Sequence, residues 1–141
     1  MEVRIYSGAS ASLRSATRNH VPVIMTEITL GPHTSIDQEF PTLYNGFAYL
    51  INGSVQVGGA VLNRGQVGWL DRPKDEGTSI LHVVSAEDDA RLVPYAGQPQ
   101  GDRVVSNGPF IGDSKEDMVR LYTEYRAGEF VRMSELGREY G

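Results

Sequence analysis

Histidines and carboxylates are the side chains of this sequence with the greatest capacity for chemistry, because cysteine is absent. Without thiols the chain can form no disulfide, thiolate nucleophile, thiolate zinc site or iron–sulfur cluster. The three histidines, His20, His33 and His82, are far apart in the sequence. Sites for non-haem iron usually combine two or more imidazoles with a carboxylate. Any such site would therefore have to be assembled by the fold from separate strands.

Other reaction classes lack their characteristic motifs. The sequence contains neither the Gly-x-Ser-x-Gly turn of many hydrolases nor the lysine-bearing P-loop. The glycine-bounded run 108–112 contains Pro109, which has no N–H to offer a phosphate. Three adjacent acids at 87–89 are more typical of a solvated turn than of an acid–base pair. The motifs therefore favour neither hydrolysis nor nucleotide binding.

The charge balance excludes further classes of partner. The sequence has 13 lysines and arginines against 18 acids, a net charge of −5, and no basic cluster. Proteins that bind nucleic acid or anionic membrane surfaces unaided usually carry such a cluster, so we expect neither partner. No apolar run approaches the roughly 20 residues of a membrane span, and the N-terminus lacks a charged-then-apolar signal pattern. We expect a soluble, cytoplasmic protein.

The hydrophobic pattern is that of an all-β body. With 141 residues, 40% of them hydrophobic, the chain is long enough for one compact domain with a real core. Short runs rich in β-branched and aromatic residues alternate with turns that contain glycine or proline, which is typical of a barrel or a sandwich. Asn52-Gly53 separates two such runs, 49–51 and 54–57. Because both residues tolerate positive φ, the pair predicts a two-residue hairpin turn.

One amphipathic helix follows the strands. Four apolar residues recur at helical spacing on one face: Met118, Leu121, Tyr122 and Tyr125. Two alternative pairs could cap its first turn, Asp113 with Glu116 or Ser114 with Asp117. Gly128 is placed to end the helix. The sequence thus predicts a single domain with a barrel over about 1–112, a helix over about 114–127 and a tail over 128–141.

The segment that ends in this helix resembles a known family. It contains Tyr95-Ala-Gly-Gln-Pro99, then Val104-Val105, then Gly108-Pro-Phe-Ile111, and then the helix up to Phe130. This order of motifs is similar to that of the C-terminal cupin domain of the pirin family, although Arg103 stands where the family usually has proline. The opening strands match as well, so the resemblance covers nearly the whole chain. It implies a cupin-type double-stranded β-helix, a jelly-roll barrel, with one C-terminal helix.

The resemblance also implies what this chain does. Complete pirins have two cupin barrels, and the N-terminal barrel carries a His-x-His pair and further ligands for iron, which some members use for quercetin dioxygenation. These 141 residues correspond to the other barrel. We therefore expect a non-catalytic, metal-free domain with a structural or interaction role. The alternative is a pirin-like quercetin dioxygenase, which would need iron or another divalent metal as cofactor.

A partner is the second implication. The face that a C-terminal barrel packs against its neighbour would be exposed in this chain unless something covers it. We expect it to be covered by a homodimer contact or by a metal-bearing cupin. A direct nucleic-acid or membrane partner is not expected.

The cupin resemblance also identifies candidate metal ligands. General cupin spacing places Asp37 and Glu39 at the positions of the His-x-His pair, and Glu76 at the position of a later histidine; His82 is a further candidate. Such a set would be an oxygen-rich site for a hard cation rather than an iron oxygenase site. The interpretation that we favour is that Asp37 and Glu39 lie on the solvent face of a strand, because they alternate with apolar neighbours.

Four residues are candidates for the lining of a small-molecule pocket. His82 lies between two apolar pairs, so it could face the interior as a hydrogen-bonded core or rim histidine. Tyr44, Tyr49 and Trp69 could belong to the core or, with His82, to a pocket at the barrel mouth. A small apolar molecule would be the ligand of such a pocket.

Overall fold

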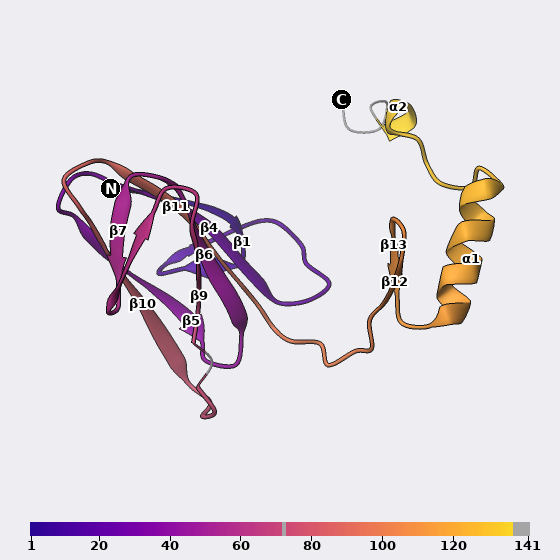
Figure 1. Cartoon of the computed structure of the whole chain (residues 1–141), viewed down its shortest axis with the longest axis horizontal. Coiled ribbons are helices and arrows are strands. Elements are labelled where there is room, and N and C mark those ends of the chain that lie inside the picture. The colour runs from indigo at the N-terminus through magenta and orange to yellow at the C-terminus, as the bar shows by residue number, and fades with distance from the viewer. Residues whose placement is uncertain (72, 137–141) are drawn as a thin grey trace. The chain divides into compact units, whose positions relative to one another are not determined.

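The computed structural model describes residues 1–71 and 73–136. Its contacts divide the chain into two compact units, Met1–Pro99 and Gln100–Gly141. The first unit is built from two main sheets, and the second from a hairpin followed by helical segments (Figure 1).

The strands of the first unit are antiparallel throughout the ladders described. The five-stranded sheet has the order β1 (Glu2–Ser7), β4 (Val23–Leu30), β11 (Ala90–Gly97), β6 (Asn45–Asn52) and β9 (Val67–Trp69). The four-stranded sheet has the order β5 (Ser35–Pro41), β10 (Thr78–Ser85), β7 (Ser54–Val57) and β8 (Ala60–Asn63). A small hairpin pairs β2 (Ala9–Ser10) with β3 (Leu13–Arg14). Among the described residues the two main sheets share no ladder, so the strands do not close into one barrel.

Both main sheets turn one face toward a single hydrophobic core. Ile28, Leu50 and Leu92 of the five-stranded sheet are fully buried, as are Val55 and Val83 of the four-stranded sheet. Burying one side chain of this size contributes roughly 1.5–3 kcal/mol. Because successive strand residues point to opposite faces, these core positions also determine which side chains point outward.

The hairpin predicted at Asn52-Gly53 is wrong. β6 pairs with β11 and β9, whereas β7, which begins at Ser54, pairs with β10 and β8. Gly53 therefore carries the chain from one sheet to the other. It has a φ of 79°, and a Cβ at this position would lie 2.4 Å from the carbonyl oxygen of Asp89. Glycine is required for this sharp corner, while the tight hairpin of the region lies at 58–59, between β7 and β8.

The second unit joins a short hairpin to a helix through aromatic contacts. β12 (Val105–Asn107) pairs with β13 (Phe110–Gly112), and both strands contact α1 (Lys115–Arg126). The ring centroid of Phe110 lies 4.8 Å from that of Tyr122, and Tyr125 and Phe130 complete the cluster. A short helix, α2 (Met133–Leu136), follows. No helix in the described part of the chain is long and apolar enough to cross a membrane.

A capping box begins α1. The N–H of Asp117 donates to Oγ of Ser114 at 3.1 Å, and the N–H of Ser114 donates to Oδ2 of Asp117 at 3.1 Å. The structure thus selects one of the two capping pairs that the sequence allows. Ala127 is the C-cap, and Gly128 follows with a φ of 74°. The expected C-terminal helix is confirmed. The proposal that barrel, helix and tail form a single domain stays a prediction. Residues 137–141 of the predicted tail lie outside the described part.

Candidate functional site

A pocket opens beside the turn between β7 and β8. Its volume is about 560 Å³, and small-molecule sites usually enclose roughly 300–1,000 Å³. Residues from the end of β5, the β7–β8 turn, the end of β9 and the middle of β10 line it. All of these elements belong to the first unit.

Apolar and aromatic side chains form most of the pocket. Phe40 and Leu81 are buried and line it, and Trp69 is an exposed lining residue. Of the aromatic residues that the sequence proposes as lining, Tyr44 and Trp69 line this pocket. Tyr49 lies on the outward face of β6 and is not among the described lining residues.

His82 and Asp37 meet on the exposed face of the four-stranded sheet. They are register partners on β10 and β5, and Nδ1 of His82 lies 2.5 Å from Oδ1 of Asp37. Contrary to the expectation from its apolar neighbours, His82 does not face the interior, because Leu81 and Val83 occupy the inward positions. An imidazole that is held by a carboxylate through Nδ1 leaves Nε2 for another partner. His82 also lines the pocket.

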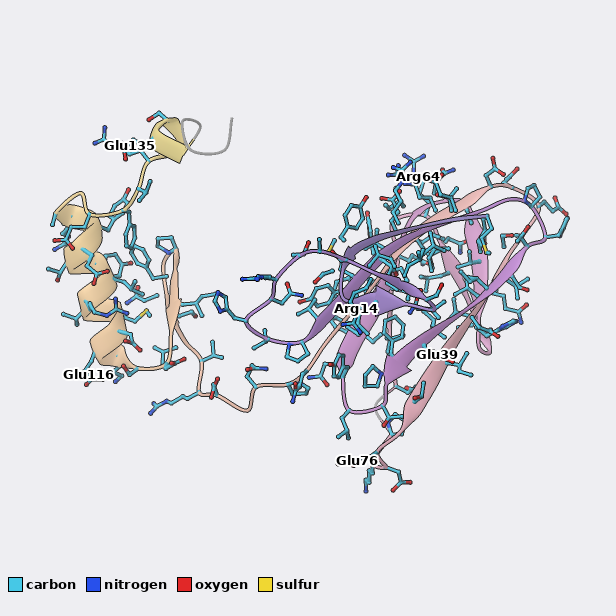
Figure 2. All side chains as sticks on the ribbon, turned by 180° about the vertical axis from the view of Figure 1, so that it is seen from behind. Arg14, Glu39, Arg64, Glu76, Glu116 and Glu135 are labelled. Atoms are coloured by element: carbon cyan, nitrogen blue, oxygen red, sulfur yellow. The ribbon has the colours of Figure 1, made fainter. Side chains whose placement is uncertain are left out.

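The other candidate metal ligands do not join this pair. Asp37 and Glu39 share the exposed face of β5, but the register partner of Glu39 is Ile80 rather than His82. Glu76 lies in the loop before β10, and Figure 2 shows it at the tip of that loop, away from Glu39. Within 1–71 and 73–136, no group of three or more histidines and carboxylates could hold a metal ion. The family resemblance implies an iron site in the other barrel, and the described residues of this chain provide no comparable set of ligands.

The remaining two histidines lie in loops. His20 is exposed in the bend before β4. His33 is exposed in the turn between β4 and β5, with a φ of 51°. Neither belongs to a group of metal ligands in the described ranges.

An aromatic row crosses the outer face of the five-stranded sheet. Met25, Tyr95, Phe47 and Trp69 are successive register partners on β4, β11, β6 and β9, and we call these four residues the aromatic row. The ring of Phe47 stacks on Tyr95 with centroids 5.4 Å apart, and it contacts Trp69 edge-on at 5.8 Å. Trp69 remains 78% exposed. The outward-facing Tyr49 extends the apolar surface beside the row.

Charged groups border the aromatic row on the same sheet. Glu27 follows Met25 by two residues, and its side chain is only 8% exposed. Nε of Arg91 donates to Oε1 of Glu27 at 2.8 Å, and the hydroxyl of Tyr6 donates to Oε2 at 2.8 Å. The hydrogen bond from Arg91, and next that from Tyr6, lowers the pKa of the Glu27 carboxyl. The border therefore contains a carboxylate that is held in its charged form.

Sequence reasoning did not identify Phe47 and Tyr95 as surface residues. The signal that could have found them is local, because each is followed by an alanine, Ala48 and Ala96, that is buried in the core. In a strand, a large aromatic residue beside a small inward one must point to the opposite face. Their meeting with Trp69 depends on the register of three strands, which no local pattern contains.

Comparisons with known proteins identify the fold and the family. Residues 25–131 match the family model of the pirin C-terminal cupin domain. Pirin-like protein 2 of Arabidopsis thaliana is 26% identical over 136 residues, which cover 92% of this chain and 41% of that protein. Human pirin is 23% identical over 124 residues, which cover 88% of this chain and 43% of that protein. The chain thus spans less than half the length of these relatives.

Solved structures agree with the family model. A crystal structure of quercetin 2,3-dioxygenase from Acinetobacter baumannii superposes with a TM-score of 0.79 at 22% identity, covering 91% of this chain and 43% of that one. The structure of GK1651 from Geobacillus kaustophilus gives a TM-score of 0.64 at 34% identity, covering 72% of this chain and 41% of that one. The predicted cupin class with a C-terminal helix is confirmed, and the chain belongs to the family of pirin C-terminal cupin domains.

Proposed function

We propose that this chain is a non-catalytic cupin module that associates with a second copy of itself through the outer face of the five-stranded sheet. The observation that carries the proposal is the aromatic row. Its four side chains lie side by side on four strands, and Trp69 is 78% exposed. Contiguous exposed apolar surface of this kind usually marks an interaction site.

The flanks of the row favour a second copy as the occupant. Tyr49 and Val67 are 40% and 44% exposed and continue the apolar surface beside the row. On the same side of the row, toward β1, the border presents both signs of charge, with Glu2 and Arg4 more than half exposed and Arg91 about half exposed. A twofold contact brings the same patch of both copies together, so a patch with both signs can complement itself.

The described residues support a non-catalytic role. The Asp37–His82 pair is the nearest approach to a ligand set, and it lies on an exposed sheet face with no third ligand described beside it. The described residues therefore contain no set of three or more metal-ligating side chains that could support the dioxygenase activity for which the Acinetobacter protein is named. We expect purified protein to contain no stoichiometric metal by elemental analysis. Consumption of oxygen with quercetin by the iron-reconstituted chain would contradict this part of the proposal.

Light scattering over a series of concentrations tests the association. We expect the wild-type chain to form a dimer and Tyr49→Lys to shift it toward monomer, because a lysine ammonium cannot be buried cheaply in an apolar contact. The matched control is Val61→Lys, which adds the same charge at an exposed position of β8 in the other sheet. A wild-type chain that stays monomeric at every concentration would overturn the self-association.

The alternative occupant has its own measurement. A metal-bearing pirin N-terminal barrel can be titrated into the chain, with Tyr49→Lys and Val61→Lys as before. A monomeric chain that binds this barrel, and loses the binding in Tyr49→Lys alone, would assign the same face to a cupin of the other type.

A further inference from the structure

We propose that the groove between β12 and α1 binds an extended peptide segment of another protein, in which two acidic residues flank an apolar one. The peptide would lie along the open edge of β12, and its acidic side chains would meet Lys115 and Arg126. The inference goes beyond self-association and does not depend on it, because the groove belongs to the second unit and the aromatic row to the first.

The groove has one wall from β12 and one from α1. All three residues of β12 line it, whereas no residue of β13 is among the described lining residues. Its volume is about 600 Å³, and the hairpin and α1 run alongside one another (Figure 1). Among the described residues β12 pairs only with β13. Its other edge therefore has backbone groups available to an added strand.

Apolar side chains form the floor of the groove. Met118 is 5% exposed and Val105 is half-buried. The hydroxyl of Tyr122 donates to the carbonyl oxygen of Asn107 at 3.3 Å, which fixes this ring beside β12. Val119 also lines the groove and is 68% exposed. An apolar side chain of the peptide would cover Val119 and gain the free energy of removing that surface from water.

Helix geometry places two cations at opposite ends of the groove. At about 100° per residue, the six α1 residues that line the groove occupy one arc of about 140°. Lys115 and Arg126 lie on that arc and are separated by about 16 Å along the helix axis. Asp117 and Glu124 lie outside the arc, where both pair with Arg120. The acids of the helix therefore do not neutralise the groove cations by these ion pairs.

The lining carries positive charge alone. Lys115 and Arg126 are exposed, and neither takes part in an ion pair that the structure describes. None of the described lining residues is aspartate or glutamate. Glu116, the neighbour of Lys115 in the sequence, is exposed and is not among them. A segment with two acids therefore finds a cation for each of them, whereas a basic segment is repelled.

The length of the groove sets the spacing of the acids. Alternate residues of a strand face the same side, and residues four apart are separated by about 13 Å. The long side chains of Lys115 and Arg126 can cover the remaining distance. The motif that fits is acid-x-apolar-x-acid, with all three of the specified side chains directed toward α1 and the apolar one against Val119.

Backbone amide NMR of the full chain tests the site with the peptide acetyl-Thr-Glu-Thr-Val-Thr-Glu-Thr-amide. We expect saturable shifts of the amides of β12 and α1. A peptide with both acids replaced by glutamine should bind about tenfold more weakly, the effect of two exposed charge contacts. Lys115→Gln with Arg126→Gln should abolish the difference between the peptides. The matched control is Arg120→Gln, which removes a charge from the other face of α1 and should preserve the difference.

A third peptide of the same composition, with its two acids adjacent at one end, tests the spacing. We expect it to bind more weakly than the first, and equal affinity would overturn the extended arrangement. Absence of a saturable shift at millimolar peptide, equal affinity of the acidic and neutral peptides, or shifts confined to the first unit would overturn the site itself. Tyr49→Lys separates this proposal from self-association, because we expect peptide binding to persist there even where the dimer is lost.

Discussion

The guanidinium of Arg91 holds the nearly buried carboxylate of Glu27, with Nε of Arg91 2.8 Å from Oε1. Tyr6 donates to the other carboxylate oxygen. The side chains of Arg91 and Glu27 join β11 to β4 on the sheet face that carries the aromatic row. This charged bridge therefore connects the stability of the sheet to pH.

Stability should fall in acid through Glu27. The folded-state pKa of Glu27 lies below its ordinary value of 4.5, chiefly because of the hydrogen bond from Arg91. Its contribution is fully present above pH 4.5 and is lost as the pH falls through the folded-state pKa. Urea unfolding between pH 7 and pH 3 should show a shallower acid loss in Glu27→Gln than in wild type. Glu2→Gln, at an exposed position, should retain the wild-type profile.

The core of the two sheets should tolerate truncation poorly. Leu92→Ala removes a fully buried side chain of β11, and such changes cost about 2–5 kcal/mol. Val61→Ala, at a 63% exposed position, should change the free energy of unfolding by less than about 0.5 kcal/mol. Equilibrium urea unfolding measures both, and similar losses in the two variants would contradict the assignment of the core.

The corner at Gly53 should be more sensitive than an open turn with the same backbone conformation. Gly53 and Gly65 have φ values of 79° and 82°, but only Gly53 is crowded, by the backbone of Asp89 and Ala90. Gly65→Ala should cost about 1 kcal/mol from the left-handed conformation alone. Gly53→Ala should cost distinctly more in urea unfolding, and an equal cost would mean that the corner can open to admit a methyl group.

The capping box should control the first turn of α1. Ser114→Ala removes the oxygen that accepts from the N–H of Asp117 and should reduce the opening free energy of the first α1 amides by about 1 kcal/mol. Amide hydrogen exchange measures this locally. Ser114→Asp, which supplies another capping oxygen, should restore protection; failure of this rescue would argue for a different role of Ser114.

The alternation of apolar and polar residues predicted which face of β5 is exposed, because a strand has a period of two. It correctly placed Asp37 and Glu39 outward. For His82 the apolar neighbours on both sides were ambiguous, and the structure assigns the inward positions to Leu81 and Val83. The contact of His82 with Asp37 spans 45 positions of sequence, so it depends on sheet register and could not be read locally.

The error at Asn52-Gly53 has a similar origin. A hairpin and a corner between sheets both need positive φ, and the residue types alone do not distinguish them. What decides is the partner of each flanking strand, and those partners lie far away in the sequence. The run of motifs that ends in the helix was more informative, because it matched a family as a whole.

The outward direction of Asp37, Glu39 and His82 has a consequence for protein engineering. A side chain moves to the other face of a strand when its position changes by one. Asp37 and Glu39 of β5 and His82 of β10 all lie on the outward face, so they cannot form a metal centre inside the core. The inward positions beside them hold Gln38 and Leu81, which face each other in register. Installing a metal in the core between the two main sheets would therefore begin with those two residues and would leave the existing carboxylates untouched.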